Sequence, residues 1–220
     1  MTCPLPQAAV GPVPQRALTV EEYLRFEETA PVKHEYVAGV VYAMSGARIR
    51  HHRIVSNIHG RIWNALRGGT CEVYRDSLKL RAGDAIYYPD VMVVCQPQDE
   101  HAYVVDGACL VVEVTSPSTA ATDWREKPVN YKHVPSLRAY LIVDHRRRRV
   151  EAHWRDDAGE WRHAATTEGP IVLPCVDLTL TLDEVYEGVT VVAVSEPPAP
   201  PYAAEWYTEE EYEADEALEP

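Results

Sequence analysis

Two acidic side chains in otherwise apolar segments are the first candidates for chemistry in this sequence. Asp90 stands in AIYYPDVMVVC and Glu113 in ACLVVEVTS, and both segments are rich in residues that favour strands. If they pair antiparallel with Asp90 opposite Glu113, Val91 meets Val112, and opposed residues share one face of the sheet. Two carboxylates side by side on an apolar face repel each other and resist burial. A Mg²⁺ or Mn²⁺ ion would relieve that conflict, because it prefers carboxylate, water and phosphate oxygens.

Phosphodiester cleavage at such an ion also needs a positive group, which holds the attacking water and offsets charge in the transition state. Lys127 is the nearest candidate, since it falls in a helix predicted for residues 122–132, after the turn SPST. The spacing alone leaves a second interpretation open, in which Lys127 is a solvated helix residue and Asp90 a turn residue after Pro89.

Three local patterns predict the elements that come before these strands. Thr19, followed three residues later by Glu22, is typical of a capped helix start and predicts a helix over residues 20–28. HEYVAGVVYAMS predicts a hairpin that turns at its Ala-Gly pair. Apolar residues that recur every three or four positions predict the longest helix over residues 50–67, ended by two glycines.

The remaining segments predict a mixed α/β domain. Four of them are expected to form the central sheet: CEVYRD, SLKLRA, AIYYPDVMVVC and ACLVVEVTS. RAYLIVD, RVEAHWR and EWRHAAT add further strands, and DLTLTLDEVYEG closes the domain. We therefore expect one domain over residues 17–194, a flexible lead-in over 1–16, and a Pro-rich spacer with an acidic tail over 195–220.

Composition argues against several classes of protein. No apolar run reaches the roughly 18 residues of a membrane-spanning helix, and no signal-peptide pattern opens the chain, so we expect a cytoplasmic protein. The five cysteines are widely spaced without a CxxC pair, so we expect reduced, mostly buried thiols instead of a disulfide framework or a zinc ribbon. Glycine-rich nucleotide loops are absent from the sequence.

The net charge of −13 is unevenly distributed. Residues 195–220 hold nine acids and no base, so the rest of the chain carries −4. Residues 47–69 hold five arginines and no acid, which leaves room for a positive surface. The tail is interpreted either as a solvated end or as a segment that binds a partner or covers the basic helix. The four arginines at 146–149 are interpreted as a solvated turn or as phosphate contacts.

An ordered series of motifs resembles a known family. YYPDVMVV, then VVEVTSPST, then PSLRAYLIVD resemble the Uma-two family of endonucleases, which belongs to the PD-(D/E)XK, or restriction-endonuclease-like, superfamily. The similarity also takes in LTVEEYL, HEYVAGVVYAMSG and LTLDEVYEGV, and it covers roughly residues 17–189. It implies a restriction-endonuclease-like core with a central mixed β-sheet flanked by helices.

The resemblance also implies roles for particular residues. It matches Asp90 and Glu113 to the family's two acids and Lys127 to its lysine, with the backbone carbonyl of Val114 as a further metal ligand. The superfamily's usual lysine position, two residues after the second acid, holds the uncharged Thr115. Pro128 follows Lys127 directly, and a proline beyond the first helical turn would alter the lysine's approach.

Further residues are candidates for accessory roles. Glu35 matches an acid in the family's first hairpin, and its alternative is an exposed charge at a strand start. His51 lies one turn before the apolar stripe and either extends toward the site or is a hydrogen-bonded core histidine. The predicted nucleic-acid contacts are Arg50, Arg53 and Arg61.

These expectations together describe a Mg²⁺- or Mn²⁺-dependent endonuclease that hydrolyses nucleic-acid phosphodiester bonds, with DNA as the substrate by resemblance. The alternative is a catalytically silent nuclease-fold module that binds nucleic acid or protein. A hydrolase of smaller phosphoesters is a third hypothesis. A homodimer would suit an enzyme that cuts two strands.

Overall fold

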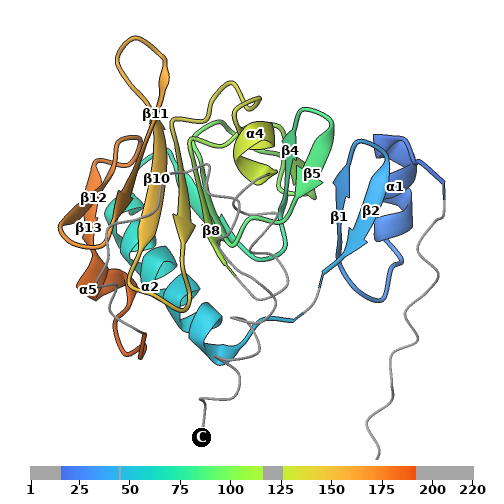
Figure 1. Ribbon diagram of the computed structural model, residues 1–220. Coiled ribbons are helices and arrows are strands. Elements are labelled where there is room, and N and C mark those ends of the chain that lie inside the picture. Colours follow the sequence, from blue (N-terminus) through green and yellow to red (C-terminus); the bar gives the residue numbers. More distant parts are fainter. Residues whose placement is uncertain (1–15, 45, 116–125, 192–220) are drawn as a thin grey trace, which may run out of the picture.

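The computed structural model describes residues 16–44, 46–115 and 126–191. Within these ranges the strands form a six-stranded, a five-stranded and a two-stranded sheet, and the helices lie around them (Figure 1). The expected lead-in and acidic tail lie outside the described residues, apart from Arg16. No helix in the described ranges is long and apolar enough to cross a membrane.

The six-stranded sheet carries the residues expected to do chemistry. Its strand order is β11-β10-β9-β8-β6-β3, in which β8 and β9 are parallel and the other neighbours antiparallel. The strands are β3 (Glu72–Arg75), β6 (Val91–Val94), β8 (Leu110–Val114), β9 (Ala139–Val143), β10 (Val150–Arg155) and β11 (Trp161–Thr166).

The smaller sheets flank it. The five-stranded sheet has the order β2-β1-β5-β4-β7. Its strands are β1 (His34–Val37), β2 (Val40–Ala43), β4 (Lys79–Ala82), β5 (Ala85–Tyr87) and β7 (Val104–Val105). The two-stranded sheet pairs β12 (Pro170–Leu173) with β13 (Leu178–Thr181), and the short helix α5 (Leu182–Val185) follows directly.

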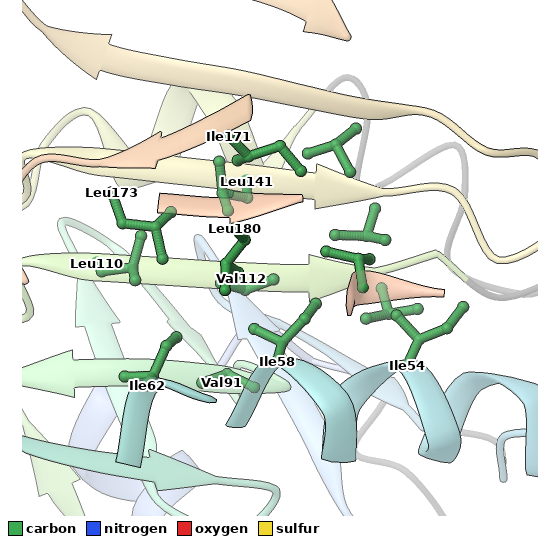
Figure 2. Close-up of a cluster of buried hydrophobic side chains, with 14 of the residues drawn as sticks. Ile54, Ile58, Ile62, Val91, Leu110, Val112, Leu141, Ile171, Leu173 and Leu180 are labelled. Atoms are coloured by element: carbon green, nitrogen blue, oxygen red, sulfur yellow. The ribbon is translucent and has the colours of Figure 1, made fainter. Parts of the chain in front are cut away.

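The long helix α2 (Ile49–Leu66) packs on one face of the six-stranded sheet. Its apolar stripe, which includes Ile54, Ile58 and Ile62, is fully buried against valines and leucines of β6, β8 and β9 (Figure 2). Side chains of β12 and β13 enter the same core. The spacing of apolar residues therefore predicted both this helix and the face that it buries.

The opposite face of the sheet is covered by β4, β5 and the helix α4 (Lys127–Tyr131). Met92, Val111 and Ile142 of the sheet pack there against Tyr87 and Tyr131. Because side chains alternate along a strand, Glu113 points to this second face, where Tyr131 contacts it, while its neighbours at 112 and 114 join the first core.

The first helix and hairpin form as the sequence predicted. The helix α1 (Val20–Glu27) begins with a capping box in which Thr19 and Glu22 satisfy each other's backbone amides. The hairpin of β1 and β2 turns at Ala38 and Gly39, whose φ angles are 46° and 95°. Positive φ at both turn residues matches the twist of the two strands.

The prediction of one central sheet for the four segments between 71 and 116 is wrong. Strands β4 and β5 join the five-stranded sheet, whereas β3, β6 and β8 lie in the six-stranded one. The segment AIYYPDVMVVC splits into β5 and β6 around Pro89, since proline cannot donate a ladder hydrogen bond. The split leaves Asp90 at the start of β6, between the two sheets.

The expectation of reduced cysteines is also wrong for the described residues. Cys71 is bonded to Cys95, and Cys109 to Cys175. The sulfurs of Cys95 and Cys109 lie 3.6 Å apart, so the two disulfides are neighbours. Cysteine spacing could not reveal this, because the four residues meet only after β3, β6 and β8 have paired and the β12–β13 turn has packed on them.

Candidate active site

The register between β6 and β8 is the one expected from the sequence. Val91 stands opposite Val112 and Val93 opposite Leu110 in an antiparallel ladder. Asp90 directly precedes Val91 and Glu113 directly follows Val112, so the two acids flank the last pair of this ladder. Two acids that are far apart in the chain therefore stand at the same end of adjacent strands.

Asp90 is held by one side chain and one backbone amide. Its Oδ2 atom accepts a hydrogen bond from the Val114 amide at 2.7 Å and lies 3.2 Å from Nε2 of His51. The side chain of Asp90 is 18% exposed, which is more than the side chains of His51, Glu35, Glu113 and Lys127. His51 comes from the first turn of α2, and the structure thus brings this predicted accessory residue to the site.

Lys127 lies between two carboxylates. Its Nζ atom is 3.0 Å from Oε1 of Glu35 and 3.1 Å from Oε1 of Glu113. All three side chains are at least nine-tenths buried. Buried charges persist in proteins when they are paired in this way. The interpretation of Lys127 as a solvated residue and that of Glu35 as an exposed charge are therefore both wrong.

The short helix α4 sets the position of the lysine. Pro128 lies in its first turn, where the missing amide hydrogen has no helical partner to lose. Four residues after Lys127, the hydroxyl of Tyr131 donates to Oε1 of Glu113 at 2.6 Å. The expected concern about Pro128 does not arise for a helix that begins at Lys127, and residues 122–125 of the predicted helix lie outside the described residues.

Tyrosines complete the wall around the lysine. Burial first, and then the charge of Glu113, raises the pKa of Tyr131 well above its ordinary value, so its hydroxyl remains a donor. The ring of Tyr87 lies 5.3 Å from Nζ of Lys127, within range of a cation–π contact. The sequence analysis assigned no role to Tyr131 or to Tyr87.

Thr115 occupies the position where the superfamily usually has its lysine. Its hydroxyl lies 3.1 Å from Nδ1 of His145, and the His145 amide donates to the same oxygen at 3.3 Å. Sequence reasoning missed His145, because it follows β9 and reaches Thr115 only through the parallel pairing of β8 with β9. The site therefore contains two histidines, one beside Asp90 and one beside Thr115.

The three arginines predicted to contact nucleic acid differ in their surroundings. Arg61 pairs with Glu187 at 2.7 Å and lies 3.4 Å from Glu184, and Arg53 donates to the carbonyl of Gly188. Both arginines thereby fix α2 to α5 and the segment after it. Arg50, in the first turn of α2, lies near the two histidines.

The donor set limits what kind of ion the site could hold. Among the described residues, no group of three or more His, Cys, Asp or Glu side chains is arranged to bind a metal. Mg²⁺ is commonly held by one or two carboxylates, with water and substrate phosphate oxygens as its other ligands. Asp90 and Glu113 supply two carboxylates, the number that such an open site uses, and too few for a closed cage.

A family comparison identifies the group of proteins to which this fold belongs. The family Uma2, described as "Putative restriction endonuclease", matches residues 20–183. The chain belongs to the Uma2 family. A Synechocystis relative named "Uncharacterized protein slr1290" is 35% identical over 178 residues, which are 78% of this chain and 93% of the relative. A second Synechocystis protein, sll1609, is 29% identical over 151 residues, which are 66% and 85% of the two chains.

A solved structure shares the fold. The crystal structure of an Anabaena variabilis protein, described as a putative nuclease belonging to DUF820, aligns with a TM-score of 0.64 and 16% identity, over 77% of this chain and 97% of the other. The expected mixed α/β, restriction-endonuclease-like fold is confirmed. The Uma2 family supports a nuclease-like function.

Proposed function

We propose that this Uma2 protein is an endonuclease that hydrolyses phosphodiester bonds of DNA with the help of Mg²⁺ or Mn²⁺. The observation that carries the proposal is the buried contact of Lys127 with Glu113, beside the pair Val91–Val112 that Asp90 and Glu113 flank. A solvated lysine and a turn aspartate would not produce this arrangement. The family's description as restriction endonucleases supports the same class of reaction.

Asp90 and Glu113 would hold the ion, and the backbone carbonyl of Val114 would serve as a third ligand. When bound, a divalent cation supplies positive charge to a phosphate oxygen and lowers the pKa of a coordinated water. His51 contacts Asp90 through Oδ2, and the second carboxylate oxygen would be the one to bind the ion. Neither histidine is needed as a metal ligand in this arrangement.

Lys127 would orient the attacking water and offset the negative charge that develops on the phosphate. Tyr131 keeps Glu113 in position by donating to the oxygen that also faces the lysine. Glu35 holds the ammonium group from the other side, at 3.0 Å. These contacts restrict the rotamers of all three charged groups, which is what a preorganised site requires.

Cleavage of supercoiled plasmid in the presence and absence of Mg²⁺ or Mn²⁺ tests the proposal. The wild-type protein should cut only with metal, and Asp90→Ala, Glu113→Ala and Lys127→Ala should each lower the rate by about 100-fold or more, because each removes charge stabilisation of the transition state. Circular dichroism on the same samples checks that the variants fold.

Lys132→Ala is the matched control for the lysine variant, since Lys132 ends the same helix and is exposed. It should cut at the wild-type rate. A wild-type protein without metal-stimulated cutting of DNA or RNA, or active-site variants that cut as well as wild type, would contradict the proposal and favour a catalytically silent module.

A further inference from the structure

Two basic segments that are almost a hundred residues apart converge beside the candidate active site. One is the start of α2, with Arg48 and Arg50, and the other is the turn after β9, with Arg146. In Figure 1 the turn between β9 and β10 and the start of α2 lie at the same, lower end of the molecule. Arg48 is exposed, and Arg50 and Arg146 are half-buried.

The lowered pKa of His145 indicates that these groups lie near one another. Burial is the first cause that lowers its pKa to about 4, and the positive groups of Arg146, His51, Arg50 and Arg48 act in the same direction. Charge effects weaken with distance, so arginines of both segments lie near enough to act on one imidazole. The sequence did not predict that the two runs are close, because no local pattern indicates that the β9–β10 turn lies near the start of α2.

Other arginines of the same two runs have structural duties. Arg53 and Arg61 fasten α2 to the segment around α5. Arg148 pairs with Asp183 at 2.6 Å, and Arg149 with Glu151 at 3.0 Å. Arg48, Arg50 and Arg146, which act on the pKa of His145, belong to the same two runs. The first turn of α2, which carries Arg50, contains no acid, whereas the first turns of α1 and α5 contain acids.

This basic surface borders the candidate site from two directions. On the α2 side, His51 is three residues after Arg48 and lies 3.2 Å from Asp90. On the β9 side, His145 precedes Arg146 and lies 3.1 Å from the hydroxyl of Thr115, two residues after Glu113. A polyanion that crossed from one segment to the other would pass over the two candidate acids.

We propose that Arg48, Arg50 and Arg146 form one phosphate-binding surface that holds the backbone of a nucleic acid across the Asp90–Glu113 site. The proposal rests on the proposed nuclease function and names the contacts that position its substrate. Arginine suits this role because its planar, always charged guanidinium binds phosphate oxygens in pairs. Such contacts position a nucleic acid without reading its sequence.

Binding of a fluorescein-labelled DNA duplex to the full chain, followed by anisotropy at several KCl concentrations with EDTA present, tests the surface without cleavage. The variant Arg48→Ala/Arg50→Ala/Arg146→Ala should bind about tenfold or more weakly, and the slope of log K against log salt should fall by about 2 to 3, since each lost phosphate contact removes about 0.9. The triple replacement of the same residues by lysine should retain most of the slope, because it keeps the charges.

Arg25→Ala/Arg81→Ala/Arg162→Ala is the matched control. It removes three exposed guanidinium groups from α1, β4 and β11, where they pair with Glu21, Asp106 and Asp156. Its salt slope should equal that of the wild type, and thermal unfolding of all variants checks that they fold. If both alanine triples weaken DNA binding equally, the effect comes from overall charge and the proposal is overturned. If neither triple weakens DNA binding, these arginines do not hold DNA and the proposal is overturned as well.

Three further outcomes can be distinguished. If a synthetic peptide of residues 195–220 binds the wild type and not the alanine triple, while DNA binds both equally, the surface belongs to the acidic tail and the proposal is overturned. A wild type that binds DNA through these arginines and never cuts it overturns the proposed hydrolysis and supports the surface. A wild type that cuts DNA while the alanine triple binds normally overturns the surface alone.

Discussion

At the scale of single residues, the candidate site contains a small group of buried charges that compensate one another. One ammonium group, from Lys127, faces the carboxylates of Glu35 and Glu113 at about equal distances. Breaking a buried ion pair by removing one partner commonly costs about 3 to 5 kcal/mol, because the other charge is left uncompensated. Each of these residues therefore contributes to stability as well as to the proposed chemistry.

His145 makes a prediction about pH. Its pKa is lowered from 6.5 to about 4 in the folded protein, first by burial and then by positive neighbours. Between these two values the unfolded chain binds a proton that the folded chain does not, so the free energy of unfolding should fall as the pH drops from about 6.5 to about 4, by up to about 1.4 kcal/mol per pH unit. Above pH 6.5 the contribution is fully present.

Urea unfolding at several pH values across this window measures the effect, and His145→Gln serves as the comparison because it cannot titrate. The variant should show a shallower loss of stability between pH 6.5 and pH 4 than the wild type. An identical pH dependence in the two proteins would show that His145 titrates normally in the folded state and would contradict the prediction.

At the scale of elements, sequence patterns predicted the features that depend on residues close together in the chain. The Thr19–Glu22 capping box, the Ala38–Gly39 turn and the apolar stripe of α2 are each set by residues a few positions apart, and all three predictions are confirmed. The register that pairs Val91 with Val112 was also expected from the sequence, because one slip would move every valine to the wrong face.

Contacts between distant segments were beyond such reasoning. The assignment of β4 and β5 to a second sheet depends on the pairing of β5 with β1 and of β4 with β5. The strand β12 had no alternating pattern strong enough to predict it. His145 and Tyr87 enter the site only through tertiary packing. Residue type and spacing made Asp90, Glu113 and Lys127 candidates but left an alternative open. The family resemblance favoured their catalytic roles over that alternative.

The paired cysteines give a prediction at this scale. The two bonds close loops with sequence separations of 24 and 66 residues. In the chain-entropy description, such loops stabilise the folded state by about 3 to 4.5 kcal/mol each. Reduction with a strong thiol reductant should therefore lower the melting temperature, and Cys71→Ser/Cys95→Ser should lose a smaller amount on reduction than the wild type.

Mass spectrometry of alkylated peptides establishes which pairs are present before reduction. A protein purified without oxidants that shows all four residues as free thiols, or a melting temperature that does not respond to reductant, would contradict the pairing. Disulfides are rare in cytosolic proteins, so the result also bears on the compartment in which the chain works.

At the scale of the whole molecule, charge is separated along the chain. The acidic segment 195–220 holds nine of the acids, and the rest carries only −4 of the net −13. The chain approaches this segment beside α2, where the carbonyl of Gly188 accepts from Arg53. Because a negatively charged segment lowers the local potential for a polyanion, it should weaken binding of nucleic acid.

Deletion of residues 195–220 should therefore tighten DNA binding at low salt, and the gain should shrink as salt screens the interaction. Anisotropy titrations of the full and shortened chains in EDTA measure both effects. A full-length variant in which the nine acids become Gln or Asn separates charge from the tail's aromatic residues. A tail deletion with unchanged affinity at low salt, or a gain that persists in high salt, would contradict an electrostatic effect.

The lysine of α4 also connects two layers of the molecule. Glu35 belongs to β1 of the five-stranded sheet and Glu113 to β8 of the six-stranded sheet, and Lys127 contacts both. The candidate site therefore lies where the two sheets meet. Gradual warming should separate the two sheets before the strands of the six-stranded sheet come apart, so the proposed activity should be lost while most strands are still paired.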